Sequence, residues 1–171
     1  MIAENSQQLV AYTAPPMSPP SAALGDRKLE PTMVQWRIDG VFQQTDVSQE
    51  DALPVNDVAV ADRDVLALRI SEVNPSTEMK LRVFDQLDDN NYPMSGDIGE
   101  AYECAFDGTG MCSVSFSEDG SAVVTIRPDE HNAARARMYV VQAVYPTAED
   151  VDMDESLTSY SVSWAVRNAT G

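Results

Sequence analysis

The sequence predicts an all-β protein, an antiparallel β-sandwich or jelly-roll-like domain preceded by an extended, proline-rich N-terminal arm. About seven or eight short segments alternate apolar and polar residues, with turn-forming Gly, Pro, Asn and Asp between them. Only residues 128–137 have the pattern of a short helix. The 171 residues, of which 43% are hydrophobic, suffice for one domain with a sizeable core. We expect the arm over residues 1–32 and the sandwich domain over residues 33–171.

The arm is distinguished by its prolines, at positions 15, 16, 19, 20 and 31. This composition favours extended, polyproline-like backbone, which forms no core of its own. Ordering such a segment costs conformational entropy, so it needs a surface to lie on, either its own domain or a neighbour. We expect this arm to bind neighbouring subunits through the following residues: Tyr12, Pro15, Pro16, Met17, Pro19 and Pro20.

Alternating hydrophobicity predicts the strands of the body at the following positions: 34–38, 65–73, 79–87, 122–126, 138–145 and 159–167. Residues 65–73 and 79–87 flank the turn signal Asn74-Pro75-Ser76, which predicts an antiparallel pair. Residues 138–145 are apolar on both faces, as is typical of a central strand. Either both faces of that strand are internal, or one contacts a neighbouring subunit. Residues 159–167 alternate cleanly, which predicts a half-buried closing strand.

The two cysteines, Cys104 and Cys112, flank the turn signal Asp107-Gly108-Thr109-Gly110. In a hairpin centred near Gly108 they face each other, so a cross-strand disulfide is a candidate, and a pair of reduced thiols is the alternative. A cysteine metal site is not expected, because the single histidine, His131, is distant in sequence.

The formal net charge of −17 is the most unusual feature of the composition. Its 17 Asp and 11 Glu stand against 9 Arg and only two lysines, all scattered, so neither nucleic-acid binding nor attraction to an anionic membrane is expected. A surface rich in short carboxylates resembles that of proteins from salt-loving organisms, where salt screens the self-repulsion. An ordinary acidic, soluble protein is the alternative, and the eight methionines favour it.

Two acidic segments carry the candidate metal ligands, namely Asp85, Asp88 and Asp89 in the first and Asp150, Asp152 and Asp154 in the second. Carboxylate-rich loops between strands can supply the oxygens that Ca²⁺ requires. Neither segment has the spacing of a helix–loop–helix calcium site, so solvated acidic loops are the alternative. No other cofactor is expected.

No catalytic motif is present, and we predict no catalytic residues and no enzymatic activity. The lone histidine and the absence of a Ser–His or Cys–His pattern leave little for nucleophilic catalysis. No apolar run approaches the ~20 residues of a membrane span. The N-terminus shows no secretory signal, so either the protein works without export or a signal has been removed.

The Pro/Ala-rich arm followed by a β-rich body resembles, in composition, the small head-decoration proteins of tailed viruses. That resemblance implies an arm that extends a capsid sheet by strand addition. We therefore expect a structural protein of a virion that binds other subunits, its own copies among them. The closing pattern of two tyrosine-bearing strands around an acidic loop resembles bacterial pre-peptidase C-terminal modules. This second resemblance implies an extracellular accessory or adhesive domain, stabilised by calcium; the triplet Asn168-Ala169-Thr170, a glycosylation pattern, favours the same setting.

Overall fold

The computed structural model describes residues 15–38, 41–44, 54–58, 65–73, 77–89, 99–106, 110–127, 138–146 and 159–168. These residues form strands and no helix, so the all-β prediction is confirmed. The first six strands are β1 (Ala22–Leu24), β2 (Arg27–Lys28), β3 (Met33–Ile38), β4 (Val41–Gln44), β5 (Asn56–Val58) and β6 (Leu66–Ile70). The others are β7 (Glu78–Phe84), β8 (Glu100–Glu103), β9 (Cys112–Phe116), β10 (Ala122–Ile126), β11 (Met138–Pro146) and β12 (Ser159–Asn168).

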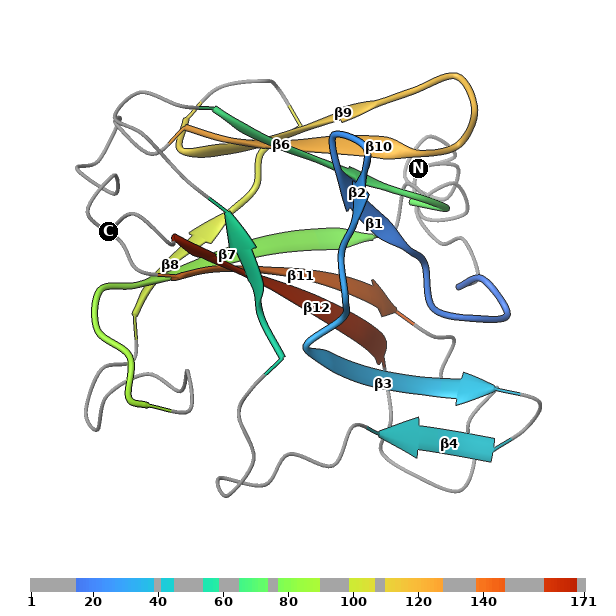
Figure 1. Ribbon diagram of the computed structural model, residues 1–171. Helices are drawn as coiled ribbons and strands as arrows, with labels where there is room; N and C mark the ends of the chain where they lie inside the picture. Colours follow the sequence, from blue (N-terminus) through green and yellow to red (C-terminus); the bar gives the residue numbers. More distant parts are fainter. Residues whose placement is uncertain are drawn as a thin grey trace, which may run out of the picture.

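The strands form two sheets that lie one above the other (Figure 1). Sheet A has the order β2-β1-β6-β10-β9, and sheet B has the order β4-β3-β12-β11-β7-β8. Neighbours along both sheets are antiparallel, and β5 adds a parallel pairing to the end of β12. This arrangement supports the sandwich-like fold, whereas the jelly-roll connectivity stays a prediction.

The core fills the space between the sheets and consists of the alternate residues that the sequence pattern singled out. Leu66, Leu68 and Ile70 of β6 are buried while the residues between them are exposed. β7 shows the same alternation, and β11 lies centrally between β12 and β7 as predicted. Trp36 lies at one end of this core, with its ring centroid 5.1 Å from that of Tyr145 and 5.2 Å from that of Tyr160.

The predicted pairing of residues 65–73 with 79–87 is wrong. β6 pairs with β1 and β10 in sheet A, whereas β7 pairs with β11 and β8 in sheet B. Consecutive strands β6 and β7 therefore lie in different sheets. Stacked sheets are about 10 Å apart, a distance that a few extended residues can span. Each strand then buries its apolar face toward the other sheet.

The predicted antiparallel hairpin of the cysteines is also wrong, although the structure does bond Cys104 to Cys112. Cys104 follows β8 in sheet B and donates its backbone N–H to the carbonyl of Met79, whereas Cys112 opens β9 in sheet A. The local pairing, between Ala105 and Ser113, is parallel. The disulfide, with 4.6 Å between its Cα atoms, thus ties the two sheets together.

Part of the predicted arm belongs to the packed body. β1 and β2 both lie before residue 33, and Ala22 and Leu29 are in the core. Two backbone hydrogen bonds extend the pairing here: Leu29, just after β2, donates to Ala22 of β1, and Ser71, just after β6, donates to Ser21, just before β1. The division of the chain at residue 32 stays a prediction. The predicted helix over residues 128–137 lies outside the described residues.

Candidate interaction surfaces on sheet B

Five strands of sheet B contribute to one row of side chains on its outer face, the face turned away from sheet A. The pairing register places the following residues opposite one another in turn: Met33, Ser163, Gln142, Lys80 and Glu103. The neighbouring row runs from Ala165 through Val140 and Arg82 to Ala101. The first row is mainly polar, and the second is apolar apart from Arg82.

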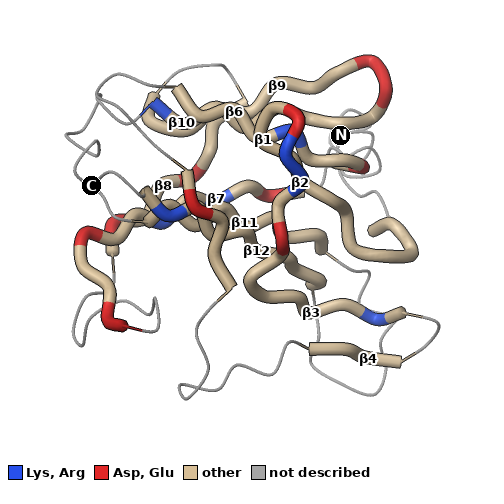
Figure 2. Tube along the Cα trace, in the orientation of Figure 1, with Lys and Arg blue, Asp and Glu red and all other residues tan. Residues whose placement is uncertain are grey.

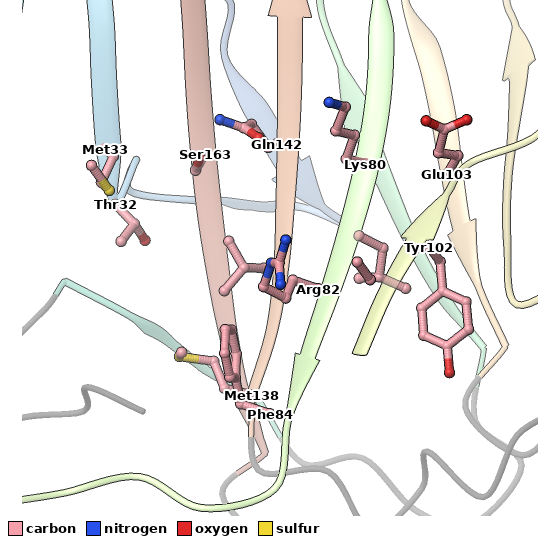
Figure 3. Close-up of a pocket in the computed structure, with 13 residues that line it drawn as sticks. Thr32, Met33, Lys80, Arg82, Phe84, Tyr102, Glu103, Met138, Gln142 and Ser163 are labelled. Atoms are coloured by element: carbon pink, nitrogen blue, oxygen red, sulfur yellow. The ribbon is translucent and has the colours of Figure 1, made fainter. Parts of the chain in front are cut away.

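A hollow of about 510 Å³ lies over these rows. Figure 3 shows Lys80, Gln142, Ser163 and Met33 at one level, with Phe84 and Met138 at the other end. Phe84, Met138 and Ala165 are buried in a small apolar cluster, against which Val55 and Leu87 pack. The hollow therefore has an apolar end and a polar end.

The polar end carries charge of both signs. Lys80 lies directly opposite Glu103 in the register, and their charged groups form no ion pair within 4.0 Å in the described part of the chain. Two strand positions away from Lys80, Arg82 projects over β11 (Figure 3). This surface can bind an extended chain or a small molecule that has an apolar part and an anionic group. Ser163 lies in a row with Met33 and Gln142, neither of which can act as a general base.

β4 offers a second surface, the open edge of sheet B. All four of its residues are exposed, including Val41 at 60% and Phe42 at 39%. β4 pairs with β3 on one side, and no described strand pairs with its other side. The hairpin of β3 and β4 lies at the margin of sheet B, away from sheet A (Figure 1). β4 is therefore a strand whose backbone can accept a further strand.

The opposite edge of sheet B, β8, differs in chemistry. Its sequence, Glu-Ala-Tyr-Glu, places a carboxylate at each end of the strand. The Tyr102 hydroxyl donates a hydrogen bond of 2.5 Å to Glu100. This bond, together with burial and the charge of Glu100, raises the pKa of Tyr102 to about 12. Charged side chains at an edge discourage the approach of another strand.

A group of buried and part-buried hydrogen bonds fixes the start of β3 to the centre of sheet B. The Asn56 amide donates to the carbonyls of Glu30 and Ala165 at 3.1 and 3.0 Å, and its Oδ1 accepts from the backbone N–H of Glu30 at 2.9 Å. The Thr32 hydroxyl accepts from the N–H of Ala165 at 2.9 Å and donates to the carbonyl of Pro54 at 2.7 Å. We call this group the Asn56 clamp.

An ion pair lies next to the clamp. Arg167 donates from Nε and Nη2 to the two carboxylate oxygens of Asp57, at 2.5 and 2.8 Å. The hydrogen bond to Asp57 raises the pKa of Arg167. Arg27 donates to the backbone carbonyl of Asp57, which links β2 of sheet A to β5.

The described arm residues lie against the protein's own body. Pro16 accepts a 3.2 Å hydrogen bond from Nε1 of Trp36, and Pro20 is buried. Pro15 and Pro19 are half-buried, whereas Met17 is 87% exposed. Tyr12 lies outside the described residues.

The candidate metal ligands are not brought together in the described part of the chain. Asp85, Asp88 and Asp89 are exposed after β7, and no group of three His, Cys, Asp or Glu among the described residues could hold a metal ion. The other three, Asp150, Asp152 and Asp154, lie outside the described residues. Asn168 of the glycosylation pattern is only 1% exposed, which disfavours attachment of a glycan to the folded protein.

Comparison with protein-family models, curated proteins and solved structures gave no match to this chain. No helix in the described ranges is long and apolar enough to span a membrane. The interpretation of function therefore rests on the chemistry of sheet B. The sequence pattern did not single out the hollow or the β4 edge, although four uncharged residues directly after the turn signal Asp39-Gly40 were visible in the sequence.

Proposed function

We propose that this protein is a non-enzymatic structural subunit that binds neighbouring subunits, copies of itself among them, in a larger assembly. The observation that carries the proposal is the open edge of sheet B at β4. An unpaired edge presents a row of N–H and C=O groups, and soluble proteins protect such rows with charge, proline or a covering segment. β4 has no charged residue and no proline, so its edge suits the addition of a strand.

The N-terminal arm contributes a second contact in this proposal. Among the described residues, Pro16, Ala22 and Leu29 contact the protein's own body, and the proposed contact with a neighbour is made by the exposed Met17 and by residues 1–14. Met17 supports this role, because an exposed methionine is a flexible apolar group that adapts to a partner surface.

The setting we propose is the surface of a virion, for instance as a capsid decoration protein. The Cys104–Cys112 disulfide supports a setting outside the reducing cytoplasm, since disulfides persist on virion surfaces and in secreted proteins. The acidic, lysine-poor composition supports a salt-rich environment.

The second candidate is an extracellular accessory β-sandwich, and the disulfide is the observation that favours it too. In this second candidate, the acidic segments bind calcium. Measuring the melting temperature as Ca²⁺ is added separates the two candidates. A calcium-stabilised domain melts at a higher temperature at millimolar Ca²⁺, whereas no such increase is expected for the assembly subunit.

The proposal is tested by sedimentation of the full chain over a wide range of protein concentration, at low and high salt. We expect species larger than the 18.7 kDa monomer, with a larger fraction at high salt. Removal of residues 1–14 is expected to lower that fraction while the circular dichroism of the body stays unchanged. A chain that remains monomeric at every concentration and salt level contradicts the proposal.

A further inference from the structure

The described edges of the two sheets differ in how well they are protected. β2 consists of Arg27 and Lys28, both charged and exposed. β9 is partly covered, because Ala105 exchanges backbone bonds with Cys112 and Val114. β8 carries its two glutamates. Among these edge strands only β4 combines a lack of charge, shown by its tan trace in Figure 2, with an outer side that no described strand pairs with.

We infer that β4 pairs antiparallel with β4 of a second copy of this chain, about a two-fold axis that passes beside Gln43. In this register Gln43 lies opposite Gln43 of the second copy, and Phe42 lies opposite Gln44. The inference rests on the proposed function and names the partner at the β4 edge. It joins the two copies of sheet B into one continuous sheet.

Self-pairing suits the chemistry of β4. Glutamine side chains donate and accept hydrogen bonds, so two facing Gln43 residues can bond to each other, as Gln ladders do between stacked strands. Phe42 can pack on the methylene groups of the facing Gln44. A two-fold contact uses the same edge of both copies, so each open edge closes the other, and this is the commonest symmetry of homo-oligomers.

Charge also favours a second copy at this edge. Two chains of net charge −17 repel each other, so they approach best where the surface is least negative. β3 and β4 together carry one charged residue, the cation Arg37, which lies directly opposite Phe42 (Figure 2). A contact through β8, the opposite edge of sheet B, would instead bring carboxylates together.

The contact is small and its strength depends on salt. A pair of four-residue strands buries far less than the roughly 1,200 Å² of a standard interface, so a weak dimer is expected. The repulsion between the two bodies is screened as the Debye length falls from about 10 Å at 0.1 M to about 3 Å at 1 M salt. Dimerisation is therefore expected to strengthen as salt is added.

Disulfide cross-linking of Gln43→Cys tests the register. Both natural cysteines are bonded to each other, so the new thiol is the free one in the chain. Under mild oxidation at high salt we expect a covalent dimer that reductant reverses. The matched control is Ala101→Cys, an exposed position on the opposite edge of the same sheet, which we expect to remain monomeric under the same conditions.

Gln43→Lys tests the same contact without cross-linking. The substitution places two like charges opposite each other on the axis, so sedimentation at high salt is expected to show loss of the dimer. Gln43 is exposed, and unchanged circular dichroism checks that the variant is folded. If wild type self-associates but Gln43→Lys does so equally, or positions 43 and 101 cross-link equally, the β4 contact is wrong and the proposed function stands. If the wild type is monomeric at every protein concentration and salt level, both the β4 contact and the proposed function are wrong.

Discussion

The two flanks of sheet B are built in opposite ways. The β7–β8 flank ends in an edge with two glutamates and is tied to sheet A by the Cys104–Cys112 disulfide. The β3–β4 flank ends in four exposed, uncharged residues and is held by the non-covalent Asn56 clamp at the start of β3. Edges in natural proteins are protected unless they have a partner. The difference therefore separates a flank that excludes other strands from one that can accept them.

The largest expected effect follows from removing the clamp on the open flank. Asn56→Ala deletes three hydrogen bonds, one buried and two part-buried, and leaves backbone groups of Glu30 and Ala165 without this partner. At about 1 kcal/mol for each bond, the free energy of unfolding should fall by about 3 kcal/mol. Urea denaturation measures this change. Ser115→Ala, an exposed position on β9, is the control and should stay near wild type. Equal stability of the two variants would show that the clamp does not hold this flank.

The covalent tie on the closed flank has the next largest effect. Replacing Cys104 and Cys112 together by alanine opens a loop whose ends are eight residues apart in sequence. The chain-entropy relation gives a loss of about 2.5 kcal/mol for so short a loop. Denaturation of the double variant, compared with wild type with and without reductant, measures it. A loss much smaller than that for Asn56→Ala would mean that the closed flank is held mainly by its packing.

The sequence predicted which face of each long strand is buried better than it predicted which strands lie beside it. Period-two alternation identified the inward residues of β6, β7 and β10, because burial of one face acts on every second side chain. Alternation carries no information about pairing partners. A short turn signal can join two strands of a hairpin or cross from one sheet to the other, and between β6 and β7 it crosses.

The short strands and the candidate surfaces were harder to predict, because the short strands have weak patterns and the surfaces depend on how distant strands assemble. β1 follows a proline-rich stretch, and its Ala-Ala-Leu sequence has little β-propensity, so tertiary pairing with β6 determines its structure. β5 is short and pairs parallel with β12 through residues more than 100 positions apart in sequence. The hollow exists only when strands far apart in the sequence, namely β3, β7, β8, β11 and β12, lie side by side, whereas the acidity and the cysteine pair were evident at once.

The ion pair beside the clamp gives a smaller effect that depends on salt. Arg167→Gln removes a partly exposed bidentate pair with Asp57 and makes the net charge more negative. Asp57→Asn breaks the same pair but lowers the net negative charge. We expect losses of about 0.5–1 kcal/mol for Arg167→Gln and less for Asp57→Asn, both reduced at high salt. Thermal melts at low and high salt measure them. A loss for Arg167→Gln that does not change with salt would instead indicate lost packing of the arginine side chain.

The smallest effect concerns Tyr102 on the closed flank and is seen only at alkaline pH. Its folded-state pKa is raised to about 12 from an ordinary value of 10.0, first by the hydrogen bond to Glu100. The neutral phenol is favoured in the folded protein, so its contribution to stability is complete below pH 10 and is lost as pH rises through 12. Tyr139, raised to about 12 by burial, contributes in the same range and remains in the variant. Tyr102→Phe should therefore lose less stability than wild type between pH 10 and 12, measured by denaturation at each pH. Parallel pH profiles for the two proteins would mean that Glu100 does not hold the phenol, and that the glutamate is free to protect the edge by charge alone.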